Sequence, residues 1–256
     1  MLNKLYKKSE IWFAVLWIVA YCVLFSLGDA ASELLGVEKS VTLPVGLLLS
    51  LGLFAFLKQG DLLSTYGICR PMSSARSMLY YIPLIVMLSA NLWFGVALNY
   101  SILETILYIL SMFCVGFLEE VIFRGLLFGA MRKDSFKAAV IVSSLTFGIG
   151  HIINLVNGSG ADLLSSILQI IYATAAGFMF VMIYYRSGSL IIPILAHGLF
   201  NSLSAFSSAL ANTPTAMIIS AVILTLITGS YAAYLAVGLK PEEASECADK
   251  GDADQL

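Results

Sequence analysis

The chain has 256 residues, of which 59% are hydrophobic and only 12% are charged, and its formal net charge is −2. A soluble domain has roughly 45–50% apolar and about 25% charged residues, so this composition excludes an ordinary soluble protein and indicates a polytopic membrane protein. Apart from a short amino-terminal group of lysines the chain has no basic tract, so we expect no nucleic-acid partner.

Apolar stretches recur along the whole chain and predict an all-α integral membrane protein of about eight transmembrane helices. Most stretches are close to the roughly 20 residues that a helix needs to cross about 30 Å of hydrocarbon. A transmembrane β-barrel is disfavoured because the apolar runs are long and do not alternate. The second stretch is the weakest, since it is short and contains Pro44. The stretches cover approximately residues 11–30, 42–58, 78–98, 102–131, 137–157, 163–185, 190–210 and 215–238.

Basic residues fall almost entirely in alternate connections between these stretches. By the positive-inside rule, this asymmetry places both termini in the cytoplasm. The first apolar run exceeds the about 7–15 residues of a signal-peptide core, so we expect it to be retained as a helix. The lack of organelle-retention motifs favours a prokaryotic plasma membrane. The alternate connections and the ends hold Lys4, Lys7, Lys8, Lys58, Arg70, Arg76, Arg132, Lys133, Lys137, Arg186 and Lys240, whereas the other connections hold only Lys39.

Residues 1–240 are expected to form a single membrane-embedded domain, followed by an acidic, disordered cytoplasmic tail over residues 241–256. The four cysteines are scattered without CxxC or metal-ligand spacing, so neither a disulfide framework nor a zinc cluster is indicated. Two of them, Cys22 and Cys114, lie inside apolar stretches and are interpreted as small core residues.

Three ionisable residues lie within the fourth apolar stretch, where burying a charge is costly and usually marks a functional site. On a helix, Glu120 and Arg124 are four residues apart and face each other, whereas Glu119 points about 100° away from Glu120. We therefore expect a Glu120–Arg124 ion pair and a second carboxylate, that of Glu119, turned toward another partner. Such a carboxylate suits a general base. A purely structural network of all three residues is the alternative.

The only two histidines of the chain also lie inside apolar stretches. His151 follows Phe147 by four residues and His197 precedes Asn201 by four, so each pair shares one helix face. At about 1.5 Å per residue, Glu119 lies roughly 20 Å and His151 about 21 Å from the basic ends of their helices. His197 is shallower, at about 10 Å, but helix tilt would bring all three to one level. Shared chemistry is therefore expected, although a buried histidine is often only hydrogen-bonded to a neighbouring helix.

Other acidic residues are better explained as helix caps. Ser101 and Glu104 match a capping box at the start of the fourth stretch. Asp134 and Asp162 each precede an apolar run and suit helix amino-termini. Asp29, near the end of the first stretch, is not assigned a role.

Three motifs, in their order and spacing, resemble those of the CPBP family, which is the CAAX protease and bacteriocin-processing family. That family includes the type II CAAX prenyl endopeptidases. The resemblance covers about residues 75–205 and lies on three of the expected helices. The motifs are Glu119-Glu120-x-x-x-Arg124, Phe147-x-x-x-His151 and His197-x-x-x-Asn201.

The resemblance implies an intramembrane endopeptidase whose site opens to the cytosol. Its partners would be membrane lipids and a peptide or protein substrate, lipid-modified or membrane-proximal. By analogy, Glu119 would activate a water with help from His151, while His197 and Asn201 would stabilise the oxyanion. The residues implied to support this site are Glu120, Arg124 and Phe147.

The resemblance leaves two cofactor states open. Water activated by glutamate without a metal is favoured, because the HExxH pair of many zinc peptidases is absent. The alternative is a catalytic zinc held by Glu119, His151 and His197 together with a water.

Competing functions are disfavoured by the sequence. Gly158-Ser159-Gly160 does not match the GxSG of rhomboid-like serine peptidases, and Gly160-Ala161-Asp162 does not match the GxGD of aspartyl peptidases. The main alternative is a non-catalytic membrane regulator or bacteriocin-immunity protein that uses the same fold. A transporter whose buried glutamates and histidines relay protons is a third possibility.

Overall fold

The computed structural model describes residues 2–155 and 162–237. Within these ranges the chain is helical almost throughout, and its only β-type pairing is an isolated bridge between Val96 and Ser207. The predicted all-α class is therefore confirmed. The expected tail over residues 241–256 lies outside the described residues, so the division of the chain at residue 240 stays a prediction.

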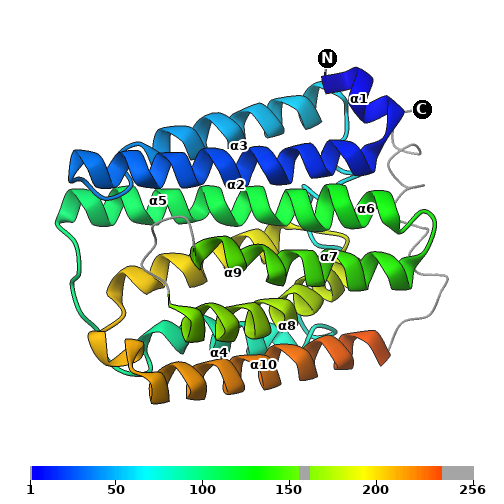
Figure 1. Cartoon of the computed structure of the whole chain (residues 1–256). Coiled ribbons are helices and arrows are strands. Elements are labelled where there is room, and N and C mark those ends of the chain that lie inside the picture. Colours follow the sequence, from blue (N-terminus) through cyan, green and yellow to red (C-terminus); the bar gives the residue numbers. More distant parts are fainter. Residues whose placement is uncertain (1, 156–161, 238–256) are drawn as a thin grey trace.

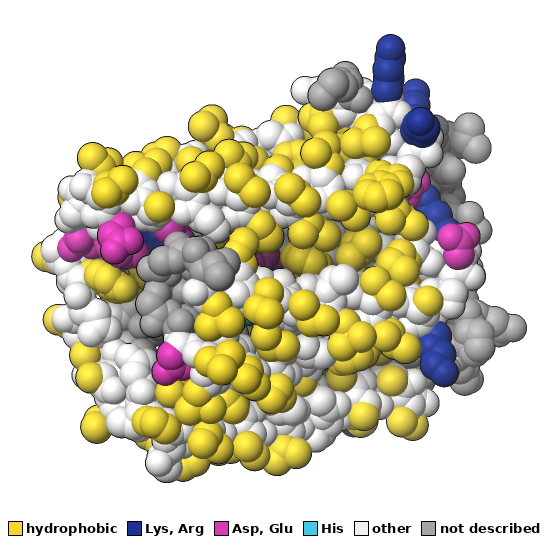
Figure 2. Space-filling model, in the orientation of Figure 1, with side chains coloured by type: hydrophobic (Ala, Val, Ile, Leu, Met, Phe, Trp, Pro, Cys, Tyr) yellow, Lys and Arg dark blue, Asp and Glu magenta, His cyan; other side chains and the backbone are white. Residues whose placement is uncertain are grey.

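Six helices in the described ranges are long and apolar enough to cross a membrane (Figure 1). Apolar side chains cover the flank of the molecule between its two ends, as expected for a surface that faces lipid (Figure 2). The six are α2 (Glu10–Leu35), α3 (Thr42–Gln59), the continuous α5 (Ile102–Glu119), η3 (Glu120–Leu127) and α6 (Phe128–Met131), α7 (Phe136–Gly150) with η4 (His151–Leu155), α8 (Leu163–Ser187) and α10 (Pro214–Val237).

Two further apolar helices occupy the predicted third and seventh stretches but are shorter than the six. They are α4 (Ile82–Ser89) continued by η2 (Ala90–Leu92), and α9 (Ile191–Leu203) continued by η5 (Ser204–Phe206). The short elements that remain are α1 (Leu2–Lys8), η1 (Leu79–Tyr81) and η6 (Ala209–Asn212).

These two helices are shorter than the apolar stretches predicted from the sequence, and the ends of both explain why. The third stretch stops being helical at Leu92, and Gly95 then takes a φ of +108°, which glycine adopts at no steric cost. The seventh returns to extended backbone at Ser207. The non-helical residues that follow the two helices pair with each other, since the N–H of Ala97 donates to the carbonyl of Phe206 at 2.9 Å.

Helix starts follow the polar residues of the sequence, with one correction. Ser101 and Glu104 form the predicted capping box of α5, and Asp162 caps α8. At α7, however, the cap is Ser135 and not Asp134. Ser135 has the extended backbone of a cap residue, whereas the N–H of Asp134 still bonds back to the preceding helix.

Helices α5 and α9 pack unusually closely, at a pair of glycines. A Cβ atom built on Gly116 would lie 2.6 Å from the backbone nitrogen of Gly198, closer than two such atoms can stand. A larger residue at either position would push the helices apart. The two glycines therefore bring the end of α5, with its glutamates, against the histidine of α9.

The two ends of the bundle differ in charge. Figure 2 shows Lys and Arg side chains gathered at the right-hand end and a group of Asp and Glu side chains at the left-hand end. The right-hand end holds α1, α6 and the start of α7, and the left-hand end holds the connection between α2 and α3 (Figure 1). The basic connections predicted from the sequence thus share one end of the molecule.

Candidate active site

The two glutamates lie where helix α5 passes into the π-helical segment η3. Such segments are rare and occur frequently at functional sites. Glu120 and Arg124 are fully buried and form an ion pair, with Arg124 Nη1 3.1 Å from Glu120 Oε1. This confirms the pairing expected from the sequence. Glu119 is also buried, with 9% of its surface exposed, but it is not part of that pair.

Phe147 connects the arginine to both histidines. The guanidinium carbon of Arg124 lies 3.9 Å from the centre of the Phe147 ring and 5.5 Å from the centre of the Phe180 ring. Besides its ion pair with Glu120, the arginine therefore makes cation–π contacts with both rings. The Phe147 ring also contacts the rings of His151 and His197 edge-on, with centroids 5.1 Å and 5.6 Å away. The geometry therefore suits the supporting role implied for this residue.

His197 bridges the two glutamates. Its Nδ1 lies 2.8 Å from Glu120 Oε1, and because a carboxylate oxygen accepts, this nitrogen is the donor. That bond fixes the ring and turns Nε2 toward Glu119, whose Oε2 lies 3.5 Å away. The imidazole is buried, with 5% of its surface exposed. Residues from α5, η3 and α9 thus meet in one polar cluster.

Glu119 has a further partner that sequence reasoning missed. The hydroxyl of Tyr21, on α2, donates to Glu119 Oε1 at 2.5 Å. The other carboxylate oxygen, Oε2, accepts no hydrogen bond from the described residues. The available signal was a tyrosine hydroxyl inside an apolar stretch, which needs a partner when it is buried. Nothing in the sequence indicated which partner.

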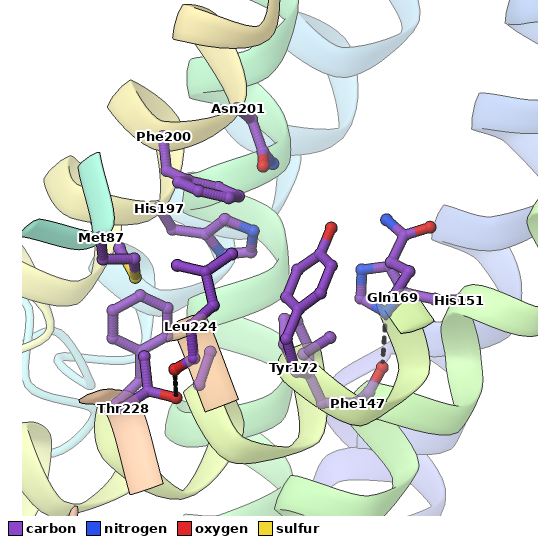
Figure 3. Close-up of a pocket in the computed structure, with 13 residues that line it drawn as sticks. Met87, Phe147, His151, Gln169, Tyr172, His197, Phe200, Asn201, Leu224 and Thr228 are labelled. Atoms are coloured by element: carbon purple, nitrogen blue, oxygen red, sulfur yellow. Dashed lines mark hydrogen bonds between the residues drawn. The ribbon is translucent and has the colours of Figure 1, made fainter. Parts of the chain in front are cut away.

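A cavity of about 1270 Å³ leads to Glu119, and His151 and Asn201 line it as well. His197 borders an adjoining, mostly apolar pocket of about 450 Å³, which His151 and Asn201 also line (Figure 3). The four residues implied as catalytic therefore line two adjoining pockets, and His151 and Asn201 belong to both. Glu119 and His197 approach each other directly there.

His151 stands at the junction of α7 and η4, across the pocket from His197. Its Nδ1 lies 3.0 Å from the carbonyl oxygen of Phe147 and donates to it, because a carbonyl only accepts. Figure 3 shows Tyr172 between the two histidines. Both His151 and Glu119 line the large cavity, and among the described residues no hydrogen bond joins their side chains.

The donor set implied for zinc does not form a ligand group. The described residues include no cluster of three or more His, Cys, Asp or Glu side chains that could hold a metal ion. The distance of 3.5 Å between His197 Nε2 and Glu119 Oε2 would suit two ligands of one metal ion. However, His151 does not stand beside them as the third.

The cysteines follow the prediction in part. Cys114 is buried in the core, as expected, and Cys22, Cys69 and Cys114 are not joined by disulfides. Cys22, in contrast, is not a core residue, because it is half-buried and lines the large cavity next to Tyr21. Cys247 lies outside the described residues, as do Gly158, Ser159 and Gly160.

Comparisons with known proteins address the same segment. Residues 101–203 match the family model described as type II CAAX prenyl endopeptidase Rce1-like. A curated Bacillus subtilis (strain 168) protein named "Putative membrane peptidase YdiL" is 40% identical over 86 residues, which is 33% of this chain and 30% of that protein. The matched part thus spans less than a third of the relative. No solved structure matches.

The matched segment 101–203 contains every residue of the three motifs. The tyrosine that holds Glu119 lies outside it. The resemblance read from the motifs is therefore confirmed, and over this segment the chain is similar to the type II CAAX prenyl endopeptidases.

Proposed function

We propose that this protein is an intramembrane endopeptidase in which Glu119 activates the attacking water. The observation that carries the proposal is how the two oxygens of the buried Glu119 carboxylate are placed. Tyr21 holds one of its oxygens, and the other faces His197 at the inner end of a large cavity. The match of the segment to a peptidase family supports the same reading.

In the proposed reaction Glu119 Oε2 takes a proton from a water, whose oxygen attacks the carbonyl carbon of the scissile peptide bond. Glu119 then gives that proton to the leaving nitrogen as the C–N bond breaks. The hydrogen bond from Tyr21 is charge-assisted and keeps the carboxylate oriented during both transfers. His151, which borders the same cavity, assists the water.

His197 and Asn201 would stabilise the oxyanion that forms on the attacked carbonyl. They are four residues apart on α9 and border the same pocket. Glu120 holds the imidazole through Nδ1 and so fixes the ring, and the hydrogen bond to the oxyanion would have to come from a proton on Nε2. A preorganised donor of this kind is worth about 10²–10³-fold in rate in a site that excludes water.

The proposed substrate is a cytosol-facing peptide or protein that is membrane-proximal or lipid-modified, for example by a prenyl group. The adjoining pocket is lined mainly by apolar side chains, including Phe180, Ala173 and Leu224, so it suits an apolar group beside the scissile bond. We place the protein in a prokaryotic plasma membrane with both termini in the cytoplasm. The proposal requires no metal or other cofactor.

The test is mass spectrometry of membrane peptides from cells that make the wild type, Glu119→Gln or Asp134→Asn. Glu119→Gln keeps the shape of the side chain but removes the base, so cleavage should fall by about 10²–10⁴-fold. Asp134 is an exposed carboxylate in the turn before α7 and should be dispensable. Wild-type cleavage by Glu119→Gln would reject the assignment. A cellular phenotype retained without cleavage would favour the regulatory or immunity role.

A further inference from the structure

Six side chains line both the large cavity and the adjoining apolar pocket, and so mark the place where the two meet. Glu119 lines only the first and His197 only the second, so a scissile carbonyl within reach of both residues lies at this junction. Four of the six side chains are polar, which makes them candidates for binding the carbonyl oxygen. The six are Phe147, His151, Gln169, Tyr172, Phe200 and Asn201.

Two of the four polar side chains are already engaged, and two are not. His151 Nδ1 donates to a backbone carbonyl at 3.0 Å, and Gln169 Oε1 accepts from Asn154 Nδ2 at 3.0 Å. The side chains of Tyr172 and Asn201 form no hydrogen bond with the residues that the structure describes. A tyrosine hydroxyl inside a protein usually has a partner, because leaving it without one costs free energy. At this junction the two free donors are available to a substrate.

Tyr172 is held by helix α8, which carries no motif residue. Its side chain is half-buried, and Figure 3 shows the ring between His151 and His197 with its hydroxyl directed into the space between them. The tyrosine ring is rigid and has only two side-chain torsions, so little conformational entropy is lost in holding the hydroxyl there. The hydroxyl is therefore a preorganised donor.

The tautomer of His197 shows why a further donor is needed. A neutral imidazole carries a single N–H, and His197 Nδ1 uses it toward Glu120 Oε1 at 2.8 Å. Nε2 is then a lone pair and can donate to an oxyanion only if the ring becomes an imidazolium. A phenol and an amide carry their protons without such a change. With a neutral His197, Tyr172 and Asn201 are the donors at the junction.

We propose that Tyr172 is a further catalytic residue, whose hydroxyl donates a hydrogen bond to the oxyanion together with the amide of Asn201. As the oxygen of the water bonds to the carbonyl carbon, the π electron pair of the carbonyl moves onto its oxygen, which accepts both hydrogen bonds. When the C–N bond breaks, that pair forms the carbonyl again and the leaving nitrogen takes the proton held by Glu119. Tyr172 keeps its own proton throughout. The inference rests on the proposed function, because the oxyanion forms only if a peptide bond is cleaved.

Tyr172→Phe tests the proposal, since it removes the hydroxyl and keeps the ring. In mass spectrometry of membrane peptides, the peptides whose cleavage depends on Glu119 should accumulate uncleaved in this variant. Tyr185→Phe is the matched control, because this half-buried tyrosine lies about 20 Å further along α8 and lines neither pocket. Wild-type cleavage by Tyr172→Phe, with cleavage lost in Glu119→Gln, would overturn the inference alone. Cleavage retained in Glu119→Gln would overturn the proposed function as well.

Kinetics with one such peptide and the detergent-solubilised full chain separate catalysis from packing. Tyr172→Phe should lower kcat by about 10- to 100-fold and leave KM within about twofold, because the hydrogen bond to the charged oxygen forms only in the transition state. A phosphonamidate analogue of the peptide, whose tetrahedral anionic group imitates the oxyanion, should bind the variant more weakly by the same factor. A raised KM with unchanged kcat, or equal affinity of both proteins for the analogue, would show that Tyr172 only shapes the pocket and would overturn the inference.

Discussion

The site is built from two regions that contribute different side chains. One is the segment that carries the motifs, and the other is helix α2, which carries no motif. The segment 101–203 provides the glutamates, the arginine, the histidines and the asparagine. Helix α2 lies outside it and provides Tyr21, Cys22, Ser26 and Asp29, which form one wall of the cavity. The motif segment therefore supplies the reacting groups. Helix α2, which has no recognisable motif, orients one of these groups and forms part of the cavity that leads to it.

After Glu119→Gln, the largest expected effect within the motif segment is that of His197→Ala. The change removes both the bridge between the glutamates and the proposed oxyanion donor, so the cleavage rate should fall by about 10²–10³-fold. Cleavage of a fixed substrate by detergent-solubilised protein would measure it, with thermal unfolding recorded in parallel. A rate within a few-fold of the wild type would show that His197 is only structural.

Tyr21→Phe tests the contribution of the helix without a motif. A hydrogen bond to a charged group is worth about 1.5–3 kcal/mol, which corresponds to roughly a 10- to 100-fold loss of rate if the bond acts in the reaction. Tyr231→Phe is the matched control, because its buried hydroxyl donates to the carbonyl of Met78 at 2.7 Å, away from Glu119. Equal rates in both variants would limit the role of α2 to packing.

The contrast between these two regions also explains what the sequence could predict. The Glu120–Arg124 pair is local, since four residues on one helix fix its geometry. Tyr21 and Glu119 are 98 residues apart, and α2 is apolar on all sides, so its sequence does not show which face turns inward. The same lack of polarity explains why the sequence indicates a core position for Cys22, although this residue lines the cavity.

The shortened third and seventh spans have a different cause. Each prediction counted apolar residues, and residues 93–98 remain apolar after the helix has ended. The pairing of Ala97 with Phe206 joins segments more than 100 residues apart, and no local pattern specifies it. Helix ends that depend on such long-range hydrogen bonds are therefore the hardest feature to predict from the sequence of a membrane protein.

Gly116→Ala should have a smaller effect, through the approach of α5 to α9. The added methyl would overlap the backbone of Gly198, and overpacking of this kind costs about 1–3 kcal/mol. We expect a lower temperature of unfolding together with a reduced cleavage rate, because the glutamates would move away from His197. Gly52→Ala is the control, since a Cβ there meets no atom within 4 Å. Equal stability of the two variants would contradict the close approach.

The smallest expected effect is that of removing metal ions, for which we predict no change. Glu119 and His197 approach each other, but no third ligand stands with them in the described residues. Cleavage should therefore continue after treatment with EDTA or 1,10-phenanthroline, and the purified protein should contain no stoichiometric metal. Loss of activity with rescue by zinc alone would instead require His151 to move next to the other two. In that case Glu119 would serve as a ligand and Tyr21→Phe would weaken zinc binding, so the role of α2 would change from orienting a base to orienting a metal ligand.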